Sequence, residues 1–187
     1  MLRIQSGELS NRPIETPPGR DTRPPLARVR KAVIDTLRPY FEGARTLDLF
    51  GGSGSYSFEA ISNGAARATV IEISGAAVNV IHRNAQALGI SDRIEVVRDD
   101  ALSAIPRFRR SARVFDVIFV APPQRKRMVE QSLATLREHP VFDGETVIVC
   151  QFERGEVGSL DAPPFTEWKR KVYGRTEVAW LQVSEGG

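Results

Sequence analysis

The decisive stretch of this 187-residue sequence is Leu47-Asp48-Leu49-Phe50-Gly51-Gly52-Ser53-Gly54, a buried-strand pattern that ends in a glycine-rich turn. A helical pattern follows, so the turn joins a strand to the N-terminus of a helix. Glycine lacks Cβ, so it adopts positive φ angles and lets ligand atoms approach the backbone closely. The stretch therefore predicts a loop that holds a nucleotide-like cofactor over a helix N-terminus. Such turns serve several kinds of cofactor, so the loop does not identify one of them.

Carboxylates follow three successive apolar runs of the sequence. Asp48, Glu72 and the pair Asp99-Asp100 each stand where a predicted strand ends. The carboxyl ends of parallel strands meet at one edge of a sheet, where ligands bind. Glu72 lies 18 residues beyond Gly54, where a Rossmann-type site uses an acid to hold ribose hydroxyls. Acids after strands also cap helices, and we interpret Asp48, Glu72 and Asp100 as site residues but Asp99 as structural.

The composition is that of one enzyme-sized globular domain, with 41% hydrophobic and 26% charged residues. The sequence has no apolar run of membrane-spanning length and no signal-peptide core after Met1, which favours a cytoplasmic protein without a membrane partner. Cys150 is the single cysteine and ends an apolar run, so we expect a buried strand residue and no intrachain disulfide. With only His82 and His139 besides, we expect no metal site.

Basic residues are concentrated near the N-terminus and in two connecting segments. Residues 1–45 hold nine Lys or Arg and five Asp or Glu, whereas the whole chain has a net charge of +3. The two further clusters are Arg107, Arg109, Arg110 and Arg113, and then Arg125-Lys126-Arg127. We interpret the first cluster as a solvated face. The second follows a Pro-Pro turn at the carboxylate edge, so phosphate contact and a solvated face both stay open there.

Strand and helix signals alternate along the chain, which predicts an α/β fold with a doubly wound parallel sheet. The expected strands cover residues 46–49, 68–71, 94–97, 114–120 and 145–150. The expected helices cover residues 26–37, 56–63, 75–88 and 128–138. Residues 168–173 and 178–183 predict a terminal hairpin that adds one antiparallel strand. Seven strands with a reversed last one is the plan of the Rossmann-like class I S-adenosylmethionine-dependent methyltransferase fold.

The chain is expected to form one domain over residues 1–187. Residues 1–25 are an extension, in which residues 2–16 predict a small hairpin and residues 17–25 a proline-rich loop. Residues 26–187 form the Rossmann-like core. We find no internal repeat and no second domain in the sequence.

Over nearly its whole length, the sequence resembles the RsmD-type 16S ribosomal RNA guanine-N2 methyltransferases. The resemblance rests on Arg3-Ile4 to Gly7, on Thr22-Arg23-Pro24 with Arg28-Val29-Arg30, on residues 47–54 with Glu59-Ala60 and Gly64-Ala65, and on residues 115–119 leading to Pro122-Pro123. The Thr-Arg-Pro loop ahead of an Arg-Val helix is the more specific signal, because the glycine loop would also serve other methyltransferases. The resemblance implies ribosomal RNA, or the small ribosomal subunit, as the partner.

The family's chemistry, carried over by similarity, assigns S-adenosylmethionine as the cofactor without a metal. The implied contacts are Asp48, Phe50, Gly52, Ser53 and Gly54, with Glu72 on the ribose hydroxyls and Asp100 beside the adenine amine. Independently of the resemblance, we expect phosphate contacts from segments predicted near the carboxyl edge of the sheet, namely from Arg23, Arg28, Arg125, Lys126 and Arg127. The oligomeric state is left open.

The chain departs from the family where the target base should be held. The family has Asp or Asn, two prolines and an aromatic residue after the fourth strand, whereas this chain has Ala121-Pro122-Pro123-Gln124. One neutral hydrogen bond contributes about 0.5–1.5 kcal/mol and a stacking surface about 1–3 kcal/mol. We therefore expect slower or differently oriented methyl transfer, with the Pro122 carbonyl retained and the Gln124 amide able to accept from a base edge.

Two rival functions explain parts of the pattern. A nicotinamide-dependent oxidoreductase would use the glycine loop and Glu72, but its third glycine would fall at Ser57 and no substrate domain follows. A non-catalytic RNA-binding protein on the same scaffold would explain Ala121 and Gln124 together with the basic N-terminus. Calorimetry with S-adenosylmethionine and NADH tests the first rival, and radiolabelled methyl transfer to ribosomal RNA tests the second.

Overall fold

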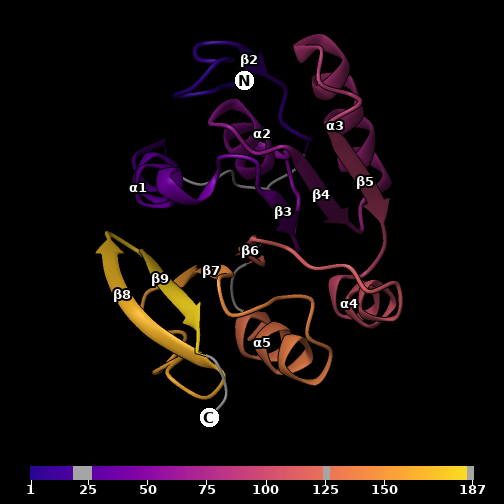
Figure 1. Cartoon of the computed structure of the whole chain (residues 1–187). Helices are drawn as coiled ribbons and strands as arrows, with labels where there is room; N and C mark the ends of the chain where they lie inside the picture. The colour runs from indigo at the N-terminus through magenta and orange to yellow at the C-terminus, as the bar shows by residue number, and fades with distance from the viewer. Residues whose placement is uncertain (19–26, 124–126, 185–187) are drawn as a thin grey trace.

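A seven-stranded sheet forms the centre of the protein. The computed structural model, drawn in Figure 1, describes residues 1–18, 27–123 and 127–184. The strand order is β5-β4-β3-β6-β7-β9-β8. The strands are β3 (Arg45–Asp48), β4 (Arg67–Glu72), β5 (Ile94–Arg98), β6 (Val117–Val120), β7 (Val147–Glu153), β8 (Phe165–Tyr173) and β9 (Thr176–Val183). The first five are parallel, and β9 runs antiparallel between β7 and β8. The class I methyltransferase fold predicted from the sequence is confirmed.

Helices cover both faces of the sheet (Figure 1). On one face lie α1 (Ala27–Leu37), α2 (Ser55–Ser62) and α3 (Gly75–Leu88), and on the other lie α4 (Ala101–Arg110) and α5 (Met128–Glu138), while η1 (Arg38–Tyr40) is a short 3-10 turn after α1. Strand residues alternate between the two cores, so Leu47 packs toward α4 and α5 whereas its neighbour Asp48 points toward α2. Cys150 is fully buried in β7, and burial raises the pKa of its thiol, as expected for a structural cysteine.

Helix α4 was not expected, because its residues were interpreted as part of a connecting segment. Pro106 lies inside this helix and removes one backbone hydrogen-bond donor, so the sequence did not predict a helix here. Buried Ala104, Ile105 and Phe108 nevertheless fall on one face of it. Its last turn exposes Arg107, and also Arg109 and Arg110, to solvent, in agreement with a solvated basic face. Arg113 differs, since its guanidinium pairs with Glu95 at 2.6 Å and lies over the Phe108 ring.

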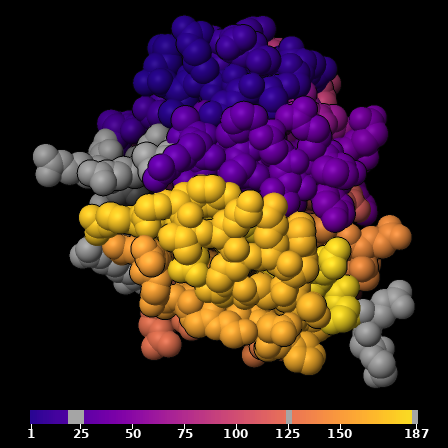
Figure 2. Space-filling view, turned by 90° about the vertical axis from the view of Figure 1, so that its left-hand side faces the viewer, coloured from indigo at the N-terminus to yellow at the C-terminus, as the bar shows by residue number. Residues whose placement is uncertain are grey.

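The N-terminal segment forms the expected small hairpin, with β1 (Leu2–Arg3) paired to β2 (Pro13–Ile14). This hairpin segment packs on the C-terminal end of α2, and Figure 2 shows it seated on the region of α1 and α2. Glu8 N donates to Ser62 O at 2.8 Å, and a Cβ on Gly7 would lie 1.8 Å from the same oxygen. All eight residues of α2 are buried as a result. Most of the proline-rich loop predicted for residues 17–25 lies outside the described residues.

A buried ion pair ties the hairpin to α1 and α2. Arg30 Nε lies 3.1 Å from Glu59 Oε1, and their side chains are only 2% and 1% exposed. Gln5 N donates to the same carboxylate oxygen at 2.9 Å, and Arg30 Nη2 donates to Arg3 O at 2.8 Å. Burial raises the pKa of Glu59, while Gln5 and Arg30 oppose that change. The position of α2, and with it the glycine loop that leads into α2, is therefore fixed from the side of the N-terminal segment.

Candidate active site

The glycine loop joins β3 to α2 at the carboxyl edge of the sheet. Gly51 N donates to Ile71 O at 2.8 Å, and a Cβ on Gly51 would lie 2.3 Å from Val70 Cγ1, so only glycine fits there. Gly54 takes the N-cap position of α2 with φ of 75°, and it provides no side-chain cap. The first N–H groups of α2 are therefore left for other partners at this edge. A Cβ on Gly52 would meet no described residue within 4 Å.

Asp48 lies beneath this loop and is 1% exposed. Its Oδ1 accepts a hydrogen bond from Phe50 N at 3.3 Å, and its Oδ2 accepts one from Ser57 Oγ at 3.4 Å. Within the described part of the chain, it has no ion pair. Burial raises the pKa of Asp48 to about 7, with Glu72 adding a smaller upward effect. The sequence predicted an acid that supports the loop, and no cation among the described residues balances the charge of that acid.

Glu72 ends β4 and touches the glycine loop directly. Its Oε2 accepts from Gly52 N and its Oε1 accepts from Ser74 N, both at 2.7 Å. The carboxylate is thus oriented by two backbone donors while each oxygen keeps a further lone pair. Ile73, the next residue, is 67% exposed, which places an apolar surface beside this carboxylate. Sequence reasoning missed Ile73, although an isoleucine directly after the predicted acid was visible.

Asp99 and Asp100 follow β5 at the same edge. Asp100 is the N-cap of α4, where its Oδ1 accepts from Ser103 N at 3.0 Å. Capping is therefore one role of Asp100, and its Oδ2 has no hydrogen bond within the described residues. Asp99 pairs with Arg107, as expected for a structural acid. Asp48, Glu72 and Asp100 thus lie at the ends of adjacent strands, and the structure brings together the three acids that the sequence singled out.

The residues after β6 lie beside the glycine loop because β6 is the neighbour of β3. Ala121 and Pro122 are half-buried and Pro123 is exposed. Gln124, Arg125 and Lys126 lie outside the described residues, so their predicted roles stay predictions. Arg127 is exposed at the start of α5 with φ of 49° and pairs with Glu130 at 3.3 Å.

Two polar residues near Ala121 were missed by the sequence analysis. Tyr56 is 4% exposed in the first turn of α2, and its hydroxyl donates a short hydrogen bond to Gln151 Oε1 on β7. The Tyr56 ring stacks on Phe119 of β6, with 5.0 Å between the ring centroids and 10° between the planes. The predicted strand ended at Cys150, but β7 continues to Glu153. A polar residue right after an expected strand end was the available signal for Gln151.

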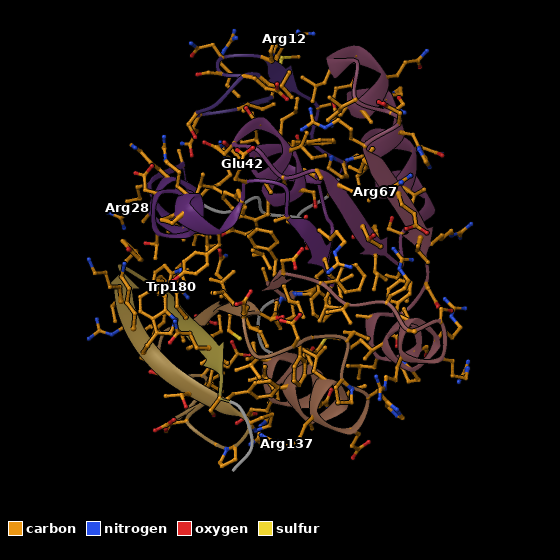
Figure 3. All side chains as sticks on the ribbon, in the orientation of Figure 1. Arg12, Arg28, Glu42, Arg67, Arg137 and Trp180 are labelled. Atoms are coloured by element: carbon orange, nitrogen blue, oxygen red, sulfur yellow. The ribbon has the colours of Figure 1, made fainter. Side chains whose placement is uncertain are left out.

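Exposed arginines surround the carboxyl edge. Arg28 on α1 lies against the β8–β9 turn, where a Cβ on Gly174 would come within 2.9 Å of its Nη2 (Figure 3). Arg154 N bonds to Arg175 O at 2.9 Å, and these two exposed arginines follow β7 and precede β9. Sequence analysis did not select Arg154 or Arg175, because only the sheet topology places them here. Arg23 lies outside the described residues.

Two open hollows lie at the opposite, amino edge of the sheet. One of about 410 Å³ is lined by Tyr40, Glu42, Gly43, Ala44, Asp116 and Glu145. The other, of about 250 Å³, is lined by Arg45, Arg67, Thr69, Ala112, Arg113, Val114 and Phe115. Neither hollow includes the glycine loop or an acid predicted for the site. In the described part of the chain, no cluster of His, Cys, Asp and Glu is placed to hold a metal ion, and no helix is long and apolar enough to cross a membrane.

Comparison with known proteins places this arrangement in a family. The family described as "Conserved hypothetical protein 95" matches residues 2–182. The chain belongs to this family, the RsmD type. The resemblance seen in the sequence is therefore confirmed over almost the whole chain.

Relatives of this RsmD-type chain are named as ribosomal RNA methyltransferases. Ribosomal RNA small subunit methyltransferase D of Escherichia coli is 30% identical over 152 residues, covering 81% of this chain and 75% of that protein. YlbH of Bacillus subtilis, provisionally named an rRNA methyltransferase, is 27% identical over 178 residues, covering 95% and 97%. The solved structure of Escherichia coli yhhF, provisionally named a methyltransferase, has a TM-score of 0.86 at 27% identity and covers 99% of both chains.

Proposed function

We propose that this RsmD-type protein is a cytoplasmic S-adenosylmethionine-dependent methyltransferase that acts on the N2 amine of a guanine in 16S ribosomal RNA. The observation that carries the proposal is the meeting of the glycine loop, Asp48 and Glu72 next to the end of β6, in a chain whose relatives are named as ribosomal RNA methyltransferases. In this proposal the amine of the target base lies between the glycine loop and residues 121–123, because β6 is the neighbour of β3. This arrangement supports a group transfer between a cofactor and a base held side by side.

The residues at the edge fit S-adenosylmethionine in shape and charge. Glu72 would accept hydrogen bonds from the ribose hydroxyls, since its two oxygens are already oriented by Gly52 N and Ser74 N. Phe50 and exposed Ile73 provide apolar surface for a purine ring. Buried Asp48 lacks a cation within the described chain, and a ligand that carries positive charge would balance it. When bound, the cofactor would supply an electrophilic methyl group: its sulfur–methyl bond would break as the carbon–nitrogen bond forms, S-adenosylhomocysteine would leave, and one amine proton would pass to water.

The chain's contribution to the reaction is positioning. The exocyclic amine of guanine is a weak nucleophile, so much of the acceleration must come from holding its nitrogen in line with the methyl carbon. The Pro122 carbonyl can accept one amine hydrogen, and the rigid Pro-Pro backbone keeps that carbonyl in place. Ala121 contributes no polar side chain. We therefore expect a slower reaction than a chain with an acid or amide at position 121 would give.

Phosphates of the RNA would be held by the exposed arginines around the edge. Arg28, Arg127, Arg154 and Arg175 lie near the carboxyl ends of β6 and β7, and Arg23, Arg125 and Lys126 stay proposed from the sequence. Each lost phosphate contact should lower the slope of log affinity against log salt by about 0.7–0.9. The Arg28→Ala variant should show this reduction. Arg137→Ala should not, because Arg137 lies in the last turn of α5, away from the carboxyl edge.

The experiment that tests the function compares ribosomal RNA modifications by mass spectrometry in cells with and without this gene. Loss of one N2-methylguanine from 16S ribosomal RNA supports the proposal, and its return should require the intact gene. Calorimetry with S-adenosylhomocysteine and with NADH tests the cofactor separately. An unchanged modification pattern, with S-adenosylhomocysteine bound tightly and ribosomal RNA bound normally, would instead favour the non-catalytic RNA-binding scaffold.

A further inference from the structure

Ala121 and Gln151 lie side by side on one face of the sheet. Strands β6 and β7 are parallel with Val120 opposite Cys150, so the next pair in register is Ala121 and Gln151. Phe119 and Val149, two residues earlier on each strand, both belong to the core that contains Tyr56 and that packs against Ala121. The alternation of side chains therefore puts Ala121 and Gln151 on the face that carries α1 and α2. They stand at the carboxyl edge, beside the glycine loop.

The Gln151 amide is held in one orientation by Tyr56. The Tyr56 hydroxyl donates to Gln151 Oε1, and the Tyr56 ring is fixed by burial and by its stacking on Phe119. Burial raises the pKa of Tyr56, so the hydroxyl keeps the proton that it donates. A hydroxyl that donates to Oε1 directs the Nε2 group of the amide away from the core. An exposed glutamine would lack this restraint and would sample many rotamers.

The oriented amide offers a donor next to an acceptor. Gln151 is half-buried, and within the described residues its Nε2 donates to no protein group. One lone pair of Oε1 is also left after Tyr56 has donated to the other. Glutamine amides bind bases in this bidentate way when a base presents an exocyclic amine beside a ring nitrogen acceptor. Guanine presents that pair at N2 and N3, whereas uracil has no exocyclic amine.

We propose that Gln151 holds the edge of the target base, in the place that Ala121 leaves without a polar side chain, and that Tyr56 is its positioning residue. This proposal rests on the proposed methyltransferase function. Gln151 Oε1 accepts one hydrogen of the exocyclic amine while Nε2 donates to the adjacent ring nitrogen. The Pro122 carbonyl and the Gln151 amide then approach the same amine from neighbouring strands. The specificity that follows is for a base with an amine, and against uracil.

Four variants test the proposal on the full chain: Gln151→Ala, Tyr56→Phe, the double variant, and Gln182→Ala as a control. Gln182 is an exposed glutamine of β9 in the same sheet, so its removal should leave methyl transfer unchanged. Gln151→Ala should lower kcat on small ribosomal subunits about tenfold. Tyr56→Phe keeps the ring on Phe119 and should lower kcat about threefold. Affinity for S-adenosylhomocysteine and the melting temperature, measured for each variant, show whether the fold and the cofactor site survive.

The double variant separates positioning from a general packing role. If Tyr56 acts through Gln151, then Tyr56→Phe should have no further effect on kcat once Gln151 is alanine. Additive losses would overturn the positioning role of Tyr56, and an unchanged kcat in Gln151→Ala would overturn the base contact. A parent protein that binds S-adenosylhomocysteine but methylates no ribosomal substrate would overturn the proposed function and this inference together. An active parent with an unaffected Gln151→Ala variant overturns the inference alone.

Discussion

Asp48 at the carboxyl edge of the central sheet differs from two acids at the amino edge in what balances its charge. At the amino edge, acids lie beside arginines: Asp116 pairs with Arg45 at 3.3 Å and Glu95 with Arg113 at 2.6 Å. At the carboxyl edge, buried Asp48 has only the neutral donors Phe50 N and Ser57 Oγ in the described structure. Arg113 accordingly lowers the pKa of Glu95, whereas burial raises that of Asp48.

This difference shows that a hollow in the surface need not mark the functional site. The amino edge has both of the hollows described above, yet Asp116, which lines one of them, is already paired with Arg45. In the described part of the chain, the carboxyl edge keeps a buried acid without a cation and a helix N-terminus without a side-chain cap. Both features lower stability unless a ligand satisfies them. A buried acid whose charge no described cation balances, rather than volume, therefore points to the site.

The largest expected effect is the pH dependence of stability that comes from Asp48. Its folded pKa of about 7 lies above its ordinary value of 3.8. Between these values the folded state keeps a proton that the unfolded state has lost, so stability falls as pH rises from about 4 to about 7. The full change is on the order of 4 kcal/mol. Asp48→Asn should remove this loss. The free energy of unfolding of the variant should therefore increase relative to that of the parent as pH rises, as measured by urea unfolding between pH 4 and pH 8.

Glu95→Gln is the matched control for the pH experiment, with the opposite sign. Arg113 holds the pKa of Glu95 below its ordinary value, so the stability contributed by this carboxylate is present above that value and lost as pH falls through the folded pKa. The parent's advantage over Glu95→Gln should therefore shrink in acid. If the difference in unfolding free energy between parent and variant changed with pH in the same way for Asp48→Asn and Glu95→Gln, the contrast between the two edges would be wrong.

Gly51→Ala should have the next largest effect. The new Cβ would collide with Val70 Cγ1 at 2.3 Å, and overpacking of this kind lowers the free energy of unfolding by about 1–3 kcal/mol. The displaced loop should also bind S-adenosylhomocysteine more weakly in calorimetry. Gly158→Ala is the control, because a Cβ there meets nothing within 4 Å and should change neither quantity. Unaltered ligand affinity in Gly51→Ala would argue against this loop as the cofactor site.

Glu72→Ala should weaken S-adenosylhomocysteine binding by about 1.5–3 kcal/mol, because charge-assisted hydrogen bonds to the ribose would be lost. Titration calorimetry should compare this variant with Glu95→Ala as a control. Glu95 is an acid on the adjacent strand β5, near the amino edge. Glu95→Ala should bind the ligand as the parent does. Equal affinities for all three proteins would show that Glu72 has no part in binding.

The smallest effect is expected for Arg45→Ala at the amino edge. The Arg45 and Asp116 side chains are 55% and 37% exposed, and such pairs contribute about 0.2–1 kcal/mol. Asp116 also keeps its hydrogen bond from the Arg45 backbone N–H in this variant. Thermal unfolding should shift slightly, and ligand affinity and methyl transfer should not change. A clear loss of methyl transfer would mean that the amino edge takes part in function.

Local patterns were enough to predict the sheet and the edge where the acids meet. Alternating apolar runs gave β3 to β5 to within a residue or two at each end, and the glycines fixed where β3 ends. The roles of Glu72 and Asp100 were harder to separate. Both follow a strand, and only the structure shows that Asp100 also caps α4 while Glu72 bonds to Gly52 N.

Long-range contacts explain most of what the sequence could not reveal. Nothing near Gln151 indicates that Tyr56, 95 residues away in the sequence, orients its amide. The buried pair of Arg30 and Glu59 is equally non-local. Helix α4 was missed for a local reason, since Pro106 disfavours a helix that packing of Phe108 and its neighbours nevertheless stabilises.

The place of β9 between β7 and β8 has a consequence for how the chain folds during synthesis. β8 leaves the ribosome first, but in the described sheet it is bonded only to β9. Until β9 has emerged, β7 presents an open edge and the core lacks Trp180. An open edge of this kind can pair with other chains and aggregate. A chain stalled before residue 176 would therefore expose an unpaired strand edge and apolar core residues to chaperones and proteases. Pairing of β9 with β7 covers that edge.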